Sequence, residues 1–552
     1  DQASLPAAAR RRVQAAAARL VEAVRRSAHT HGGLDAFLQE YELSNREGVT
    51  LMCLAEALLR IPDADTRDRF IRDKIGEADW EKHLGNSRSF FVNASTWALM
   101  LTGRLVRMGE DEQDLGGFVG RLIARSGEPV IREALIQAMR ILGQQFVIGR
   151  TIEEALGRAG EDETRGYRHS FDMLGEAART MADADRYLAA YEHAIRAIGD
   201  AGAKEPGISV KLSALHPRYE PAQRGRVLRE LVPRLLDLAR LAKSCNAGLT
   251  VDAEEADRLD LSLDVIAAVS GDPSLKGWDG FGLAVQAYQK RAAPLLEWLG
   301  VLARSQRRRF NLRLVKGAYW DTEIKRSQEG GYEDYPVFTR KASTDVSFLA
   351  CARLMARDAK AFYPQFATHN AYSLAAVLEI MGKRRDFEFQ RLYGMGEALY
   401  EEVVPEQAMG IPCRVYAPVG SHEDLLPYLV RRLLENGANT SFVNRIVDEK
   451  LPVADIVADP VAHIAKLAAR RHPQIPVPRR LFGDARVNSR GYDLSDPPAR
   501  TALDRRLAVF AAASWRAAPL IGGEEQEGGT AAAAHEPADR RRALGDVRVA
   551  SD

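Results

Sequence analysis

The sequence predicts an α/β fold, namely a (β/α)8 TIM-like barrel that follows an N-terminal helical region. Short apolar runs alternate with helix-like stretches, which is typical of parallel β/α architecture. Most runs also carry or precede a polar residue, as expected where the chemistry gathers at the carboxyl ends of barrel strands. An eighth strand cannot be placed from the pattern, but seven can: Ile208–Leu212, Leu249–Val251, Phe281–Val285, Phe310–Val315, Phe366–Thr368, Phe387–Phe389 and Cys413–Ala417.

The pattern of the first 140 residues predicts helices. The Ala- and Arg-rich stretch Leu5–Ser27 is a strong helix former. Ser44 with Glu47 resembles a capping box that opens the apolar run Leu51–Leu59. We therefore expect a helical arm and helical domain over residues 1–140, the barrel over 141–450, and a separate segment over 451–552.

A further helix is predicted from Ser421 to Asn439, where Ser421 and Asp424 resemble a capping pair and Gly437 is a natural stop. Two adjacent guanidinium groups on one of its faces could clamp a small anion. The alternative is a solvated face with an internal Arg–Glu pair. The residues that share this face are Tyr428, Arg431, Arg432 and Glu435.

Composition argues against several classes of protein. With 77 basic and 76 acidic residues the net charge is +1, which does not indicate nucleic-acid binding. The basic clusters Arg10–Arg12, Arg307–Arg309 and Arg540–Arg542 are short and scattered, as on a solvated surface. The sequence shows no signal peptide and no bilayer-spanning stretch. Four distant cysteines without a CxxC pair indicate neither a zinc site nor a disulfide framework, and they fit a reducing cytoplasm: Cys53, Cys245, Cys351 and Cys413.

Three further segments receive structural interpretations. Glu254, Glu255 and Asp257 form an acidic cluster without a suitably spaced histidine, so we expect a solvated acidic loop and no metal site. Pro473, Pro476 and Pro478 suggest a linker. Residues 520–540 are rich in Gly, Glu and Ala, and we expect them to be disordered.

Seven motifs occur in order along the chain: SVKLSALHPRY from Ser209, TVDAEEADRL from Thr250, RLVKGAYWD from Arg313, YPVFTRK from Tyr335, YPQFATHN from Tyr363, RVYAPVG from Arg414 and YLVRRLLENGANTSFVNR from Tyr428. Together they resemble the proline dehydrogenase part of proline utilization A, a family of bifunctional bacterial flavoenzymes. The resemblance covers most of residues 40–450, and seven ordered motifs are far more specific than one.

The resemblance implies an FAD-dependent L-proline dehydrogenase. Hydride would pass from proline C5 to the flavin, giving Δ1-pyrroline-5-carboxylate, and a quinone at the inner membrane surface would accept the electrons. Side chains cannot accept a hydride, so a cofactor is required. No convincing GxGxxG occurs, because GMGEAL from Gly394 lacks the third glycine and is better read as a rim loop. In the family, FAD instead lies across the carboxyl ends of the barrel strands.

The cofactor contacts are carried over motif by motif. Arg313 should lie near the reactive flavin nitrogen, where a fixed cation stabilises the negative charge of the reduced ring. Gln286 should hydrogen-bond the ring, and Gly317 would permit close backbone approach. The other residues that match cofactor contacts are Val315, Lys316, Ala318, Trp320, Thr339, Lys341, Thr368, His369, Asn370 and Glu435.

The resemblance also supplies the substrate side. Arg431 and Arg432 should grip the proline carboxylate, assisted by Lys211, which should pair with Asp252. Asp252, Arg313 and Lys211 form the catalytic set, although a salt-bridged carboxylate is a weak general base, and the role of Asp252 is alternatively only to orient Lys211. For Leu392, core packing is an equal alternative to pocket lining. The residues expected to line the pocket around the proline ring are Tyr416, Tyr428, Tyr319 and Leu392.

The remaining expectations concern partners. Some family members carry a ribbon–helix–helix DNA-binding module, and since no counterpart is evident, we expect no nucleic-acid partner for this chain. NSRGYDL from Asn488 and SWRAAPLIGG from Ser514 resemble the beginning of the family's aldehyde dehydrogenase half. We therefore expect a linker and a truncated start of that half over 451–552, without the second activity. A cytoplasmic location, peripheral attachment to the inner membrane and a homo-oligomer are compatible with the resemblance.

Two rival functions share part of this pattern. Methylenetetrahydrofolate reductases share a related flavin barrel, but the paired arginines and the Lys211–Asp252 pair favour a small amino acid as substrate. A redox-switched regulatory module is the second rival, and the missing DNA-binding segment weighs against it.

Overall fold

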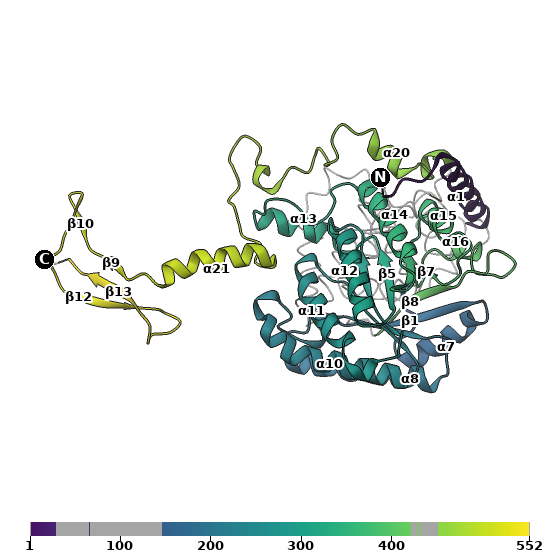
Figure 1. The fold of residues 1–552 in the computed structure, drawn as a ribbon, viewed down its shortest axis with the longest axis horizontal. Coiled ribbons are helices and arrows are strands. Elements are labelled where there is room, and N and C mark those ends of the chain that lie inside the picture. The colour runs from purple at the N-terminus through teal and green to yellow at the C-terminus, as the bar shows by residue number, and fades with distance from the viewer. Residues whose placement is uncertain are drawn as a thin grey trace, which may run out of the picture.

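The computed structural model describes residues 2–28, 66, 146–420, 428, 431, 446 and 451–550. At its centre, eight parallel strands close into a barrel in chain order (Figure 1). The strands are β1 Tyr167–Met173, β2 Gly207–Val210, β3 Gly248–Val251, β4 Phe281–Gln286, β5 Phe310–Val315, β6 Phe362–Ala367, β7 Glu388–Leu392 and β8 Cys413–Val419. The predicted barrel is therefore confirmed.

The eighth strand that the pattern did not place is β1. It pairs with β2 on one side and with β8 on the other, so it closes the sheet. Its sequence, YRHSFDM, is not a continuous apolar run, because Arg168, Ser170 and Asp172 bond to partners inside the barrel. The alternating apolar side chains, such as Phe171, belong to the hydrophobic core.

The other strands coincide with the seven predicted runs, with shifted ends. The run Phe310–Val315 is reproduced residue for residue as β5. Strand β6 begins four residues before the predicted Phe366, and β7 continues to Leu392. Lys211 lies directly after β2, where it is the N-cap residue of α9.

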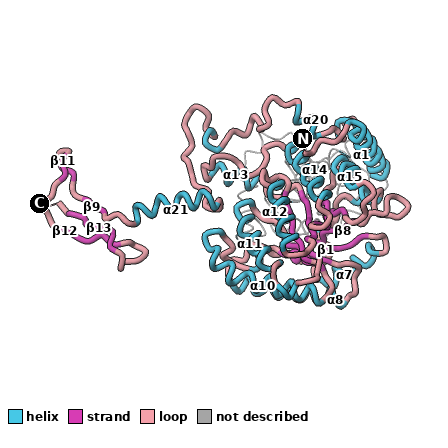
Figure 2. The backbone as a smooth tube through the Cα atoms, viewed as in Figure 1, coloured by secondary structure: helices cyan, strands magenta, loops and turns pink. Residues whose placement is uncertain are grey.

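Helices surround the barrel (Figure 2). Their buried faces are apolar, as with Leu231, Leu235 and Leu238 of α10. Thr180 and Asp183 form a capping box at the start of α8. The helices are α7 Ile152–Glu163, α8 Met181–Asp200, α9 Leu212–Leu215, α10 Arg224–Ser244, α11 Leu259–Ser270, α12 Ala292–Ser305, α13 Trp320–Glu329, α14 Lys341–Arg357, α15 Ala371–Met381 and α16 Glu397–Glu401, with 3₁₀ turns η2 Pro221–Gln223, η3 Ala256–Arg258 and η4 Pro273–Leu275.

An ion cluster fills the amino-terminal end of the barrel. Glu388, at the start of β7, is fully buried and accepts hydrogen bonds from Arg414 (Nε, 2.6 Å) and Arg168 (Nη1, 3.1 Å). A buried carboxylate needs such partners because desolvation would otherwise favour its neutral form. The arginines hold the pKa of Glu388 below its ordinary value despite the burial, which tends to raise it.

The predicted N-terminal helix is α1, Ala7–Ala28, which lies beside α15 and α16 (Figure 1). Arg12 pairs with Glu379 of α15. Arg25 donates to the backbone carbonyls of Ile446 and Leu451, both at 2.9 Å. The expected capping box at Ser44 and the rest of the helical domain lie outside the described residues.

The C-terminal segment first contacts the barrel and then leaves it. The Tyr335 hydroxyl donates to the Pro476 carbonyl (2.7 Å), so the predicted proline-rich linker packs on the loop before α14. Further along, α21 begins beside η2, where Arg500 donates to the Pro221 carbonyl (3.3 Å), and the last strands lie apart from the barrel (Figure 1). The elements of this segment are α19 Val453–Ile456, α20 Pro460–Ala465, η5 Pro478–Arg480, α21 Pro497–Ala511, β9 Trp515–Ala517, β10 Leu520–Ile521, β11 Glu524–Glu525, β12 Ala531–His535 and β13 Ala543–Arg548.

The expectation of disorder over residues 520–540 is wrong. Strands β10 and β11 form a hairpin, and β12 pairs with β13. Gly522 and Gly523 join β10 to β11 with φ angles of 63° and 89°, which is the conformation that a tight two-residue hairpin turn requires. The glycine-rich composition of residues 520–540 therefore reflects turns between short strands.

Within the described ranges, no helix combines the length and the apolar character needed to cross a membrane. The described cysteines, Cys245, Cys351 and Cys413, are free thiols.

Candidate active site

The carboxyl-terminal half of the barrel interior contains a buried cluster around Arg313 of β5. The guanidinium lies 2.5 Å from Asp252, which follows β3, and Nε donates to Gln390 of β7 at 2.7 Å. Nη2 donates to the Ser209 hydroxyl of β2 at 2.9 Å. Arg313 is only 4% exposed, and its contacts with β2, with β7 and with the residue after β3 fix its orientation.

Lys211 lies in the same cluster with two carboxylates. Its Nζ is 3.3 Å from Asp252, which confirms the predicted ion pair, but it is closer to Asp172 of β1, at 2.6 Å. The Tyr416 hydroxyl donates to Asp252 Oδ2 at 2.6 Å, and Lys211 Nζ also donates to Tyr416 (3.2 Å). The predictions missed Asp172 because its strand was not placed.

The charges of this cluster determine its protonation. Burial alone would lower the pKa of Lys211, but Asp172, Tyr416 and Asp252 outweigh it and raise that pKa well above its ordinary value. Burial would raise the pKa of Asp252, yet Lys211 and Arg313 hold it below its ordinary value. Desolvation raises the pKa of Asp172. Asp252 is thus a stable anion, which agrees with its weakness as a general base.

A second ion pair joins Arg431 to Glu176. The two guanidinium nitrogens lie 2.6 and 2.9 Å from the two carboxylate oxygens, a bidentate geometry. Arg431 also lies over the Tyr319 ring, 5.4 Å from its centroid. Burial opposes the charge of Glu176, but the hydrogen bonds from Arg431 hold its pKa below the ordinary value. Glu176 follows β1 in the GEAA stretch, so the unplaced strand concealed it as well.

The rest of the predicted anion clamp is only partly described. Tyr428 is buried, 4% exposed, while Arg432 and Glu435 lie outside the described residues. Both ends of the predicted helix, Ser421 and Asn439, also lie outside the described residues. The roles of Arg432 and Glu435 therefore stay predictions.

Gln286 occupies the predicted position at the end of β4, with its amide held on both sides. Nε2 donates to the Glu254 carbonyl (2.8 Å), and the Ala318 N–H donates to Oε1 (3.4 Å). Gly317, beside Ala318, has a φ of 134°, and a Cβ there would lie 2.4 Å from the Tyr288 ring. Only glycine fits this close approach.

Two helix N-termini lie at the carboxyl end of the barrel near predicted cofactor residues. Helix α14 begins at Lys341, and its N-cap residue, Arg340, makes no side-chain capping bond. Helix α15 follows Asn370, whose side chain accepts from the Ser373 N–H. Such termini favour anions such as the diphosphate of a dinucleotide.

His369 and Leu392 are joined at this rim. The Leu392 N–H donates to His369 Nε2 (3.2 Å), which places the ring hydrogen of a neutral His369 on Nδ1. Thr368 is buried, and its hydroxyl accepts from the Asn370 N–H (3.1 Å). The loop after β7 holds Gly394 at a φ of 72°, as expected for a rim loop.

Other predicted cofactor residues bond to protein partners away from the central cluster. Lys316 pairs with Asp345 of α14, and the Trp320 indole donates to the Phe338 carbonyl (2.8 Å). The Thr339 hydroxyl accepts from the His472 N–H (3.0 Å). Val315 is the half-buried last residue of β5. The structure therefore brings these residues to the rim but not into the ion cluster.

The expected solvated acidic loop is wrong for Glu254. This side chain is 9% exposed and accepts from the Ser213 N–H (3.1 Å), and burial raises its pKa to about 7. Arg258 pairs with both Glu254 and Glu255, and Asp257 pairs with Arg326 of α13, so the acidic cluster is held by ion pairs. In the described part of the chain, no group of three or more His, Cys, Asp or Glu residues could hold a metal ion.

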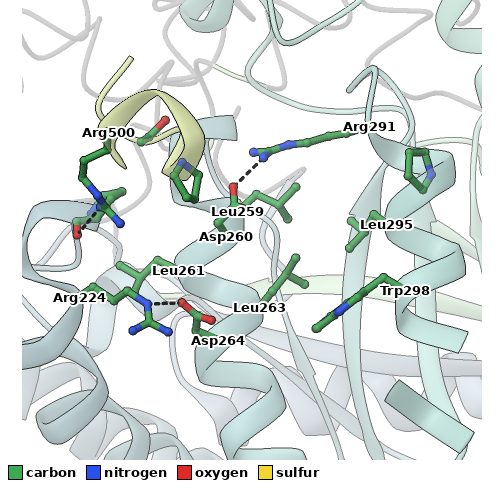
Figure 3. A pocket seen from close by; sticks show the side chains of 14 residues that line it. Arg224, Leu259, Asp260, Leu261, Leu263, Asp264, Arg291, Leu295, Trp298 and Arg500 are labelled. Atoms are coloured by element: carbon green, nitrogen blue, oxygen red, sulfur yellow. Dashed lines mark hydrogen bonds and ion pairs between the residues drawn. The ribbon is translucent and has the colours of Figure 1, made fainter. Parts of the chain in front are cut away.

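A separate pocket lies between α11 and α12, near the start of α21 (Figure 3). It has a volume of about 520 Å³, with an apolar lining that includes Leu263, Leu295 and Trp298. Two ion pairs, Arg291–Asp260 and Arg224–Asp264, cross its wall. Arg500 of α21 completes the charged part of the lining, and its guanidinium donates to the Pro221 carbonyl.

Comparison with family models decides the family. The model described as proline dehydrogenase matches residues 155–445, more than half of the chain and nearly the whole barrel. The chain belongs to the proline dehydrogenase family. Its barrel is therefore that of an oxidoreductase family, and the resemblance predicted from the seven motifs is confirmed.

Individual relatives extend the match beyond the barrel. The chain is 50% identical to bifunctional protein PutA of Klebsiella aerogenes over 572 aligned residues, covering 100% of this chain and 43% of the relative. It is 53% identical to that of Salmonella typhimurium, covering 89% and 38%. A crystal structure of a Bradyrhizobium japonicum proline utilization A mutant shares 50% identity with a TM-score of 0.71, covering 93% and 52%. The chain thus spans about half or less of the relatives it matches.

A second family model overturns one expectation. Residues 33–146 match the model described as the DNA-binding domain of proline dehydrogenase. The expectation that this chain has no nucleic-acid-binding segment was therefore wrong. Neutral net charge and scattered basic clusters could not reveal it, because both average over the whole chain.

Proposed function

We propose that this chain is an FAD-dependent L-proline dehydrogenase that forms Δ1-pyrroline-5-carboxylate. The observation that carries the proposal is the pairing of a buried, internally neutralised Lys211–Asp172–Asp252–Arg313 cluster with the Arg431 guanidinium, within a barrel of this family. Such an arrangement suits a small amino acid with one carboxylate.

The residues present fit the cofactor. The uncapped N-terminus of α14 and the N-terminus of α15 would face the FAD diphosphate, with Lys341, His369 and Asn370 nearby. Gln286 Nε2 carries a second N–H besides the one donated to Glu254, and that hydrogen would bond the flavin ring. Bound FAD supplies the hydride acceptor that no side chain can provide.

The substrate side acts by positioning. Arg431, with the predicted Arg432, would hold the proline carboxylate, and this carboxylate must take the place that Glu176 now occupies on Arg431. Lys211 stays protonated beside Asp172 and Asp252 and adds positive charge at the carboxylate. Tyr319, Tyr416, Tyr428 and Leu392 would surround the ring and orient C5, which lowers the entropic part of the barrier.

Other elements of the reaction follow from the same proposal. A quinone at the inner membrane surface would be the electron acceptor, and an otherwise cytoplasmic protein would attach there peripherally. The fixed charge of Arg313 would favour the reduced, anionic flavin. Residues 451–552 would lead toward an aldehyde dehydrogenase half, and self-association remains compatible with this arrangement.

A visible absorption spectrum before and after anaerobic L-proline tests the proposal. We expect flavin bands that bleach when proline is added. Flavin bands that ignore proline would contradict the substrate. A colourless protein that cannot be reconstituted with FAD would contradict the enzyme itself.

A second candidate function is DNA binding, favoured by the family match over residues 33–146. A gel-shift titration with a labelled DNA duplex, at low and at high salt, measures it. Binding that weakens as salt rises would support the candidate, since phosphate contacts release counterions. No shifted band at the lower salt concentration would reject it for this chain.

A further inference from the structure

One residue at the barrel rim, Ala256, is held through both of its backbone polar groups. Ala256 lies in η3, after β3, and its N–H donates to Glu323 Oε1 of α13 at 2.7 Å. Its carbonyl accepts from Arg291 Nη2 at 2.5 Å. Ala256 and Glu323 are each 3% exposed, so water does not substitute for these bonds. The loops after β3, β4 and β5 are joined at this point.

Arg291 connects the Ala256 carbonyl to the pocket in Figure 3. Its Nη1 lies 2.6 Å from Asp260, the pair drawn there, and Nε donates to Gln289 (3.2 Å). The guanidinium therefore bridges the pocket wall and residues 254–257, which we call the rim segment. The Glu323 carboxylate comes from α13, where the Ser327 hydroxyl donates to the Glu323 backbone carbonyl (2.7 Å).

The held segment also positions Gln286. Two residues before Ala256, the Glu254 carbonyl accepts from Gln286 Nε2 at 2.8 Å. The Ala318 N–H donates to the amide oxygen on the opposite side. Because an amide has an N–H side and an oxygen side, these two bonds decide which side faces the flavin ring.

We propose that Glu323 is a positioning residue for the cofactor site: by holding the Ala256 N–H it fixes the Glu254 carbonyl, which in turn fixes the amide of Gln286. The inference rests on the proposed function, since the effect on Gln286 matters only if a flavin binds there. Loss of the acceptor at position 323 would release the rim segment and let the Gln286 amide rotate. Glu323 itself need not touch cofactor or substrate.

The test compares Glu323→Leu, which removes the acceptor at similar size, with Glu323→Gln, which retains an oxygen. Hydrogen exchange of residues 254–257, FAD affinity of the apoprotein by flavin fluorescence, and proline kcat and KM are measured. For Glu323→Leu we expect exchange at Ala256 to be at least about tenfold faster. FAD binding and kcat should fall by about tenfold, the effect of one hydrogen bond, with KM within about twofold. Glu323→Gln should stay near the wild type.

Glu329→Leu is the matched control, since Glu329 ends the same helix, is exposed and pairs only within it, with Lys325. It should leave all three readouts unchanged. If Glu323→Leu fails to fold, Arg291→Met releases the Ala256 carbonyl instead of the N–H and should give the same changes. Wild-type FAD affinity and kcat in a folded Glu323→Leu, or equal losses in Glu323→Gln, would overturn the inference. Absence of proline-dependent bleaching in the wild type would instead overturn the proposed function, while the exchange data would still report on the rim segment.

Discussion

The ammonium of Lys211 lies 2.6 Å from Asp172, nearer than the 3.3 Å that separate it from Asp252. Asp252 is shared with Arg313, whereas the contacts of Asp172 in this cluster centre on Lys211. Two cations and two carboxylates thus cancel in a buried site. Any change of one charge leaves an uncompensated partner, which is costly away from water.

The first prediction follows for Asp172→Asn. The variant leaves one net positive charge in the cluster and removes the nearest group that raises the Lys211 pKa. We expect kcat/KM for proline to fall about tenfold or more and the melting temperature to drop by several degrees. Steady-state kinetics and thermal melts measure both. Asp200→Asn, at the exposed carboxylate that ends α8, is the control and should change neither. Wild-type kinetics in Asp172→Asn would refute the assignment.

The second prediction concerns Arg431→Met. Removing the guanidinium takes away a bidentate partner for the proline carboxylate, so the proline KM should rise by about a hundredfold, as for a lost charged hydrogen bond. FAD content should be retained, because none of the contacts that hold Gln286 or Gly317 involves Arg431. Steady-state kinetics and the flavin-to-protein absorbance ratio measure these effects.

Two companion variants sharpen this result. Arg196→Met changes an exposed arginine of α8 and should leave KM unaltered. Glu176→Gln weakens the competitor for Arg431, so its proline KM should be equal to or below that of the wild type. An unchanged KM in Arg431→Met would remove Arg431 from the substrate site.

The sequence predicted the barrel because seven strands carry apolar runs and the intervening helices carry amphipathic faces. It did not predict β1, whose interior side chains Arg168, Ser170 and Asp172 break the apolar pattern. The strand is compatible with the barrel because other strands supply partners for those groups, such as Glu388 of β7 for Arg168. Such partners are distant in sequence, and periodicity cannot reveal them.

Part of the site could be predicted from the sequence, because the carboxyl ends of parallel barrel strands meet at one rim. Lys211, Asp252 and Arg313 were expected at the rim, and they contact one another as charged pairs. Glu176 and Asp172 were missed together with β1. Glu254 was misjudged, because whether a carboxylate is solvated depends on tertiary packing, here against Ser213 and Arg258. Charge pattern alone does not report burial.

The third prediction uses Gly317→Ala. Position 317 has a φ of 134°, and a Cβ there would lie 2.4 Å from the Tyr288 ring, so the rim loop must move. We expect lower FAD content and a loss of about 1–3 kcal/mol of stability. Gly277→Ala is the matched control, since its φ is 74° with nothing within 4 Å, so it reports backbone strain without the clash. Equal effects of the two variants would show that close approach at Gly317 is unimportant.

The last prediction is a pH dependence that originates at Glu254. Burial raises its pKa to about 7, against an ordinary value of 4.5 in the unfolded chain. Between these values the folded protein holds a proton that the unfolded chain has released, so the free energy of unfolding falls as pH rises through this window. The slope is about 1.4 kcal/mol per pH unit, and the loss is complete above pH 7.

Glu254→Gln mimics the neutral acid at every pH and keeps an oxygen for the Ser213 N–H. The melting temperature of the variant relative to the wild type should therefore be higher at pH 8 than at pH 5. Glu323, whose pKa burial also raises to about 7, titrates in both proteins and cancels in the difference. If the melting temperatures of the two proteins instead change in parallel across this pH range, Glu254 is ionised in the folded protein. Water would then reach the loop after β3.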